Sequence, residues 1–187
     1  MNNAVRTMIS EVFPRWSMAK AKTSTFYLRE TIDVDSTPTQ SEIDLTVYVD
    51  PVNSQGLLIR AVDFIWYDSA TFLPLDANAD WQAAIQLHDS NLGGLVDLEN
   101  EHQVASGSIT SISGSEVSSD QDFFPDRLGM AKGEGRIVVN DSLEVATDAG
   151  GSSIPATMVC TVVMEVQVVR LSKEDYISLA LQSVSQN

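Results

Sequence analysis

Residue types that commonly carry catalysis or bind metals are scarce in this chain. It contains two histidines, His88 and His102, and one cysteine, Cys160. A zinc site needs several Cys or His ligands, and the thirteen residues between the histidines match no ligand spacing. The sequence therefore predicts no catalytic metal centre and no cofactor. Cys160 lies in an apolar run and is expected to be a small buried residue, and a single cysteine excludes an intrachain disulfide.

The segment "DANAD" holds the acidic cluster that most resembles a cation site. Asp76, Asn78 and Asp80 follow one another in the order that opens a calcium-binding loop. Such a loop also needs Gly at its sixth place and a bidentate Glu at its twelfth, and those places are occupied by Trp81 and Leu87. The favoured interpretation is a turn in which Asp80 caps a helical turn over residues 81–88. The three residues remain a weak calcium candidate.

Other kinds of active site leave no pattern in the sequence. The segment "KGEGR" (132–136) lacks the glycine spacing and the strand-then-helix setting of a phosphate-binding loop. No G-x-S-x-G elbow marks a nucleophilic serine. Pairs of carboxylates are unavoidable among 26 acidic residues, and none is marked as a glycosidase pair. The sequence therefore predicts that the protein is not an enzyme.

One aromatic cluster, "DFIWYD", offers a surface on which a sugar or a partner protein can stack. In a strand, alternate side chains face opposite sides, so Phe64 and Trp66 are expected on one side and Tyr67 on the other. Core packing of Phe64 and Trp66 is the favoured interpretation.

Charge is distributed very unevenly along the 187 residues, whose net charge is −15. Residues 1–29 carry five lysines and arginines against one acid, whereas residues 30–187 carry six against 25. An acidic body of this kind repels itself in solution and stays soluble, and it does not bind a polyanion directly. The basic start of the chain is therefore set apart from the body.

Residues 1–23 are interpreted as a basic N-terminal arm. In "AVRTMISEVF" (4–13) the apolar residues share one helical face, and Pro14 ends this short helix. Such an arm either packs on its own sheet with its cations in solvent or reaches a neighbouring subunit, lipid head groups or a nucleic acid. The residues expected to make such a contact are Arg6, Arg15, Trp16, Lys20 and Lys22.

Residues 24–171 show the alternation typical of β-strands. About eight strand-like segments follow one another, many of them 8–12 residues apart, with turn residues between them, which favours an antiparallel β-sandwich. The segment 42–50 predicts a strand in which Ile43, Leu45, Val47 and Val49 point inward. Residues 56–69 predict a central strand covered on both faces.

Later segments of the sandwich are expected as follows. Weaker strands are predicted near 93–98 and 105–113. The segment 105–122 is rich in Ser and Gly and is interpreted as a hairpin or a long surface loop. A second hairpin is predicted around Asn140–Asp141, and 156–171 is the longest strand signal.

Residues 172–187 predict a C-terminal helix. Ser172 and Asp175 are spaced as a capping box. One face of this helix is expected to be apolar and consists of Tyr176, Ile177, Ala180, Leu181 and Val184.

The layout of residues 24–171 resembles the single jelly-roll coat proteins of icosahedral viruses with an internal membrane that infect archaea or bacteria. The shared features are an all-β sandwich of about eight strands, a basic N-terminal arm, an acidic body and the lack of a catalytic pattern. The resemblance implies that copies of the chain bind one another, and any second coat protein, to form capsomers and a closed shell. The arm then lies toward an internal membrane or genome, while loops such as 104–121 face outward or meet neighbours.

The same resemblance places the protein in a virion, made in the host cytoplasm, with no small-molecule substrate. No stretch reaches the ~20 apolar residues of a spanning helix, and no signal peptide is read at the N-terminus. Two alternatives stay open: a carbohydrate- or ligand-binding sandwich module, which needs an exposed aromatic platform, and a non-viral lattice or filament subunit, which needs an export route.

Overall fold

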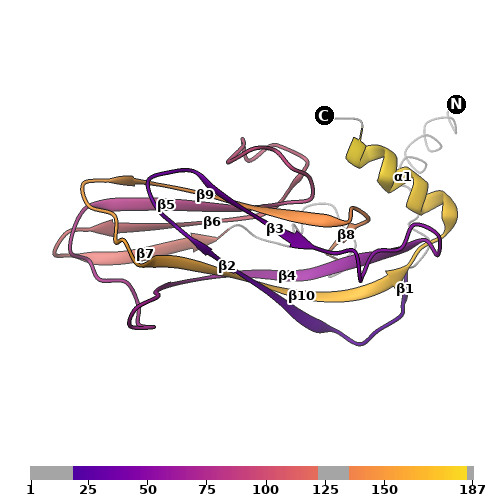
Figure 1. The fold of residues 1–187 in the computed structure, drawn as a ribbon, viewed down its shortest axis with the longest axis horizontal. Helices are drawn as coiled ribbons and strands as arrows, with labels where there is room; N and C mark the ends of the chain where they lie inside the picture. The colour runs from indigo at the N-terminus through magenta and orange to yellow at the C-terminus, as the bar shows by residue number, and fades with distance from the viewer. Residues whose placement is uncertain (1–18, 122–134, 185–187) are drawn as a thin grey trace, which may run out of the picture.

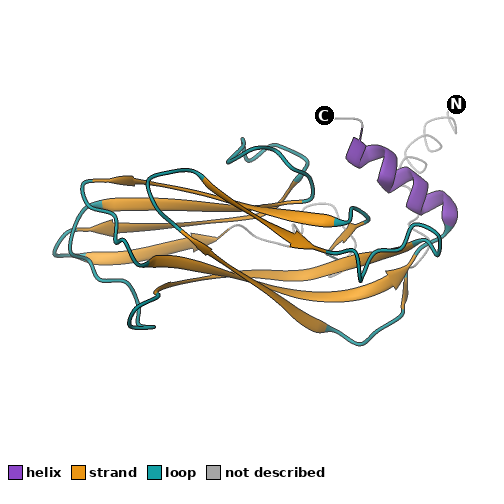
Figure 2. Ribbon diagram, in the orientation of Figure 1, coloured by secondary structure: helices purple, strands orange, loops and turns teal. Residues whose placement is uncertain are grey.

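The computed structural model describes residues 19–121 and 135–184. Within these ranges, ten β-strands pack as two antiparallel sheets, and one helix follows the last strand (Figures 1 and 2). The predicted all-β antiparallel sandwich with a C-terminal helix is therefore confirmed. The predicted N-terminal helix lies outside the described residues, together with Arg6, Arg15 and Trp16.

The first sheet is built around its long strand β10, which pairs with β2 on one side and β4 on the other. β8 pairs with β4, and the short β1 pairs with the end of β10 beyond β2. The strands of this sheet are β1 (Lys20–Ala21), β2 (Phe26–Asp33), β10 (Met158–Arg170), β4 (Gln55–Asp68) and β8 (Arg136–Val138).

The second sheet has the order β3-β9-β5-β6-β7. The chain passes from one sheet to the other at most connections, and it stays in the second sheet only from β5 through β7. This order of crossings is that of a jelly roll. The strands are β3 (Thr39–Asp44), β9 (Ser142–Gly151), β5 (Trp81–His88), β6 (Gln103–Ile112) and β7 (Glu116–Gln121).

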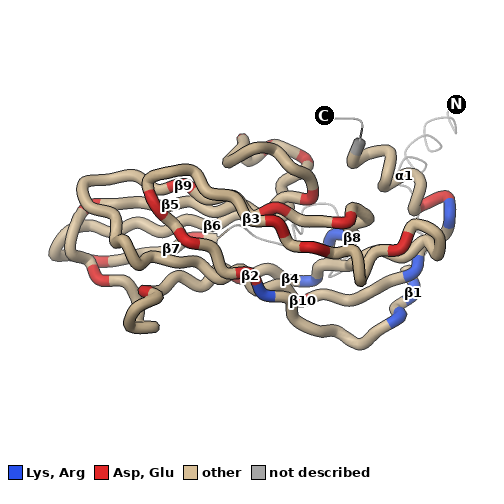
Figure 3. The backbone as a smooth tube through the Cα atoms, in the orientation of Figure 1, with Lys and Arg blue, Asp and Glu red and all other residues tan. Residues whose placement is uncertain are grey.

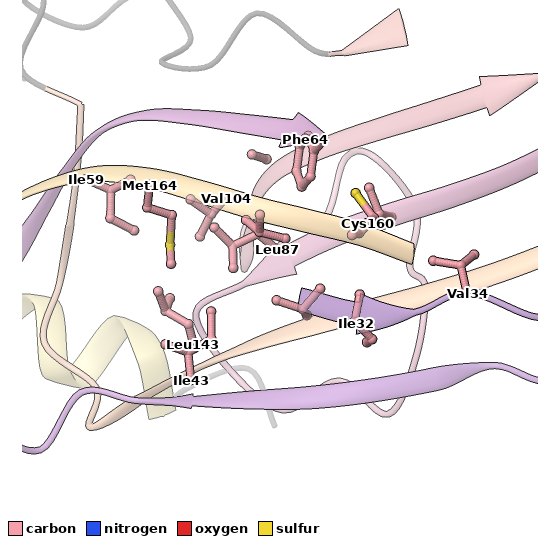
Figure 4. Packing of buried hydrophobic residues seen from close by; sticks show 14 of the residues in the cluster. Ile32, Val34, Ile43, Ile59, Phe64, Leu87, Val104, Leu143, Cys160 and Met164 are labelled. Atoms are coloured by element: carbon pink, nitrogen blue, oxygen red, sulfur yellow. The ribbon is translucent and has the colours of Figure 1, made fainter. Parts of the chain in front are cut away.

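The core lies between the sheets and is filled by the alternate residues of each strand (Figure 4). Met164 of β10 is fully buried opposite Leu87 of β5 and Leu143 of β9, as the period-two pattern requires. Gly107 has a packing role, because a Cβ at this position would lie 2.8 Å from the ring of Phe64. The fold therefore depends on close contact between the sheets, as protein interiors generally do.

The predicted helical turn over residues 81–88 is wrong. This segment is the strand β5, and it pairs with β6 and β9. Trp81, Ala84 and Ile85 fit a helical face, but Trp81, Ala83 and Ile85 fit a strand equally well, and these latter three are the buried ones. Eight residues are too few to distinguish the helical period from the strand period. The strand forms because β5 hydrogen-bonds to β6 on one side and to β9 on the other.

Three other local predictions need correction. β3 ends at Asp44 and a turn follows, so Leu45 and Val49 are buried whereas Val47 is 76% exposed. Residues 93–98 form no strand. The chain around Asn140–Asp141 is not a hairpin, because β8 pairs with β4 in the first sheet and β9 pairs with β3 and β5 in the second.

The predicted hairpin of β6 and β7 and the C-terminal helix α1 (Lys173–Val184) are present. The capping interaction of α1 also forms: the backbone N–H of Asp175 donates to Ser172 Oγ at 3.1 Å, and that hydroxyl donates to Asp175 Oδ2 at 2.7 Å. Both contacts satisfy polar groups of the first turn, which have no partner within the helix itself.

Candidate assembly surface

The two sheets differ sharply in charge. The strands of the first sheet contain five lysines and arginines and five acidic residues, whereas those of the second contain six acidic residues and no lysine or arginine. The connection from β5 to β6 (89–102) adds four more acids to the second sheet. Figure 3 shows the Lys and Arg segments along the first sheet and at the start of α1. The two sides of the sandwich therefore present different charge to their surroundings.

Cations gather at the end of the first sheet next to α1, on a surface that we call the basic edge. Lys20 in β1 lies directly opposite Arg170 in β10, and both side chains are exposed. Directly opposite residues of an antiparallel pair share one face, and like charges there repel. The ion pairs between described residues are those of Asp89 alone, so neither cation is neutralised by them. The basic edge consists of Lys20, Lys22, Arg170 and Lys173.

Lys22 is the most tethered cation of the basic edge. Its ammonium group donates to Gln55 Oε1 across the end of β10, and its backbone N–H donates to Val168 O at 2.8 Å. The side chain of Asn53 and, to a smaller degree, the charge of Lys22 hold the pKa of Asp50 below its ordinary value. Strand pairing thus fixes the last residues of the predicted arm, Lys20 and Ala21, on the first sheet.

Two adjacent exposed cations form a favourable place for an anion. A carboxylate or a phosphate placed between Lys20 and Arg170 removes their repulsion and gains charge-assisted hydrogen bonds, in which Arg contributes its planar fork of donors. The basic edge also continues directly into the N-terminal segment, which carries Arg6 and Arg15. A surface of this charge can therefore bind an anionic group.

The second sheet presents a different outer surface, because residues 89–102 fold over part of it (Figure 1). The backbone of Val96 exchanges two 2.8 Å hydrogen bonds with the side chain of Gln86 in β5. The N–H of Leu92 donates to Glu144 Oε2 of β9 at 2.9 Å. His88 is fully buried beneath this connection. Residues 89–102 thus cover Gln86 and Glu144 on the outer face of the second sheet, and their backbone forms hydrogen bonds with both side chains.

Burial lowers the pKa of His88. Desolvation lowers the pKa of His88 to about 4, the nearby charge of Asp89 opposes this effect, and His102 adds to it weakly. Its Nε2 lies 3.0 Å from Gln86 Oε1, whereas its Nδ1 has no hydrogen-bond partner among the described residues. His88 is therefore neutral at pH 7 and opposes protonation while the protein stays folded.

A partly buried ionic contact links the two sheets, and sequence reasoning missed it. Arg136 of β8 donates from Nε to Asp89 Oδ2 at 3.0 Å and from Nη1 to Gln103 O at 3.1 Å. The other oxygen of Asp89, Oδ1, lies 2.8 Å from His102 Nδ1. Arg136 and Asp89 are 47 residues apart, so no local pattern announces the pair.

The weak calcium candidate has a structural explanation. Asp80 Oδ1 accepts the N–H of Ser113 at 2.8 Å, and Asn78 O accepts the hydroxyl of the same serine at 3.3 Å. Both residues therefore hold the β6–β7 turn, while Asp76 is exposed. Among residues 19–121 and 135–184, no three His, Cys, Asp or Glu side chains are grouped so that they can hold a metal ion.

Aromatic side chains occupy both faces of the first sheet. Phe64 is 4% exposed and Trp66 packs against the core, as predicted. Tyr67 faces outward and stacks with Phe72, with ring centroids 6.3 Å apart. Phe72 is 77% exposed and has a φ of 59°, which is uncommon for a residue other than glycine.

Comparisons with known proteins give little that bears on function. No protein-family model and no curated protein sequence matches this chain. A solved structure from Desmodium yellow mottle tymovirus is similar over 88% of this chain and 97% of its own, with 7% identity and a TM-score of 0.42. A likeness of this extent establishes neither a family nor a function. In the described part of the chain, no helix has the length and hydrophobicity to cross a bilayer.

Proposed function

We propose that the protein is a structural subunit, the major coat protein of an icosahedral virion, and that its copies assemble into a closed shell. Jelly rolls are a frequent architecture of viral coat domains, although the same fold also serves other roles. The observation that carries the proposal is the division of charge between the sheets. A sandwich with a basic edge and an acidic opposite face can join its copies side by side through complementary surfaces.

The basic edge and the N-terminal segment are then directed toward an anionic neighbour. That neighbour is the acidic surface of an adjacent subunit, an internal membrane or the genome. The pairing of Lys20 with Arg170 supports this role, because like charges directly opposite each other repel and no ion pair between described residues neutralises either one.

The first test is the mass of the purified protein by light scattering at low and at molar salt, with electron micrographs of any large fraction. The proposal predicts rings, capsomers or shells that loosen in molar salt, because exposed charge pairs are screened there. A monomer of 20.4 kDa at both salt concentrations would overturn it.

One observation favours a second candidate, a carbohydrate-binding module. The exposed Phe72 and the half-buried Tyr67 that stacks with it form a small aromatic platform on the outer face of the first sheet. Binding on a glycan array that is lost in Phe72→Ala, in a protein that stays monomeric, would favour this function over the coat protein.

A further inference from the structure

The helix α1 covers the body of the protein with only part of its apolar surface. Tyr176 is 8% exposed, and Leu179 and Ala180 pack with it against Val139 and Leu171. Ile177 and Leu181, which belong to the same predicted apolar face, are 57% and 65% exposed. They are spaced four residues apart and therefore form one continuous apolar stripe on the helix.

We propose that this stripe is the docking site of the chain's own N-terminal segment, residues 4–13, which packs along α1 as a second short helix. The described chain begins at Ala19, and Ala19 packs against the same cluster as α1. Ala19, the first described residue, therefore lies beside the covered face of α1. Its predicted apolar face consists of Val5, Met8, Ile9, Val12 and Phe13.

The lengths of the two segments agree with this docking. The twelve residues of α1 extend over ~18 Å and ten helical residues over ~15 Å. Residues 14–18 span up to ~17 Å when extended, which exceeds the ~8–10 Å between the axes of packed helices. The chain can thus leave Ala19, turn, and lie along α1.

Charge is also complementary. Residues 1–18 carry Arg6 and Arg15 against Glu11. α1 carries Glu174 and Asp175 in its first turn against Lys173. The two segments therefore have net charges of opposite sign, which favours their association over that of two copies of α1. This inference does not depend on the proposed coat function, since it concerns one chain alone.

Amide hydrogen exchange of residues 173–184 tests the docking in the full-length protein. Replacing the apolar face of the segment with Ile9→Asp and Val12→Asp should accelerate exchange in α1 about tenfold, because the helix loses its cover. The matched variant Thr7→Asp with Ser10→Asp changes the polar side of the same segment and should leave exchange as in the wild type. Equal exchange in all three proteins overturns the proposal.

Two further arms of the experiment identify other occupants of the stripe. The protection of α1 in the wild type should not change when the protein is diluted a hundredfold, because the segment belongs to the same chain. Protection that disappears on dilution assigns the stripe to a second copy and overturns the proposal. Protection that depends on added phosphatidylglycerol vesicles assigns it to a lipid surface and overturns it equally.

Discussion

The two sheets of the sandwich have equivalent inner faces and very different outer faces. Alternating apolar residues of both sheets meet in one core. On the outside, the first sheet exposes Lys20, Arg29, Arg170 and Tyr27, whereas the second sheet is acidic and partly covered by residues 89–102. Inner faces are constrained by packing, which any jelly roll needs. The difference between the outer faces therefore indicates where the function of this particular chain lies.

The first way to test this comparison is to remove the contact that joins the sheets. Arg136→Ala leaves Asp89 buried with one partner fewer, and we expect a loss of about 3 kcal/mol in the free energy of unfolding. The matched variant Arg29→Ala removes an exposed cation of the first sheet and should cost less than about 0.5 kcal/mol. Urea unfolding of both variants measures the difference, and equal losses would contradict the assigned role of Arg136.

The covered face of the second sheet predicts a specific pH dependence. Because the folded-state pKa of His88 is lowered to about 4, the unfolded chain binds a proton between pH 6.5 and 4 that the folded protein does not. Stability therefore falls as the pH falls through this window, by about 2 kcal/mol at pH 4.5. His88→Gln should remove this part of the loss.

Chemical unfolding at pH 7 and pH 4.5 of the wild type and His88→Gln gives the comparison directly. Carboxylates titrate alike in both proteins, so the difference between them isolates His88. Parallel loss of stability in the two proteins would mean that residues 89–102 do not keep His88 away from water.

The capping of α1, which follows β10 at the end of the first sheet, gives the next prediction. Ser172→Ala removes the acceptor for the N–H of Asp175 and should cost about 1 kcal/mol. Ser178→Ala, an exposed position in the middle of the same helix, should be neutral or slightly stabilising. Thermal unfolding followed by circular dichroism distinguishes them, and a neutral Ser172→Ala would refute the capping role.

The smallest expected change in stability is that of Lys20→Glu, and it tests directly why the first sheet keeps cations on its surface. Lys20→Glu replaces a like-charge pair with an opposite-charge pair across from Arg170, so the isolated subunit should become more stable by about 0.5 kcal/mol. Arg29 lies opposite Val163 rather than a cation, so Arg29→Glu should show no gain. A destabilised Lys20→Glu protein would contradict the view that the basic edge is kept for a partner rather than for the fold.

Much of the fold could be predicted from the sequence, because alternation in segments such as 158–170 depends only on local residue order. The errors arise where local order is ambiguous or where a distant segment decides. β5 fits two periods, and residues 136–148 resemble a hairpin although β8 pairs with β4, about eighty residues earlier. Val47 follows the alternation but lies in a turn.

The candidate site shows the same division. The basic character of Lys20 and Lys22 is visible in the sequence, and their role stays a prediction. The position of Lys20 opposite Arg170 is not visible in the sequence, since it depends on a register between residues 150 positions apart. The Asp89–Arg136 contact is likewise a product of the sandwich, which brings the edge of one sheet to the end of the other.

The central claim is that complementary charge on the two outer faces drives assembly, and reversing the basic edge tests it most directly. Light scattering at low salt should show large particles for the wild type and for Arg29→Glu, whose change lies elsewhere on the first sheet. Lys20→Glu with Arg170→Glu should remain near the subunit mass of 20.4 kDa at the same salt and concentration. Particles of wild-type mass in the double variant, while Arg29→Glu also assembles, would contradict the account.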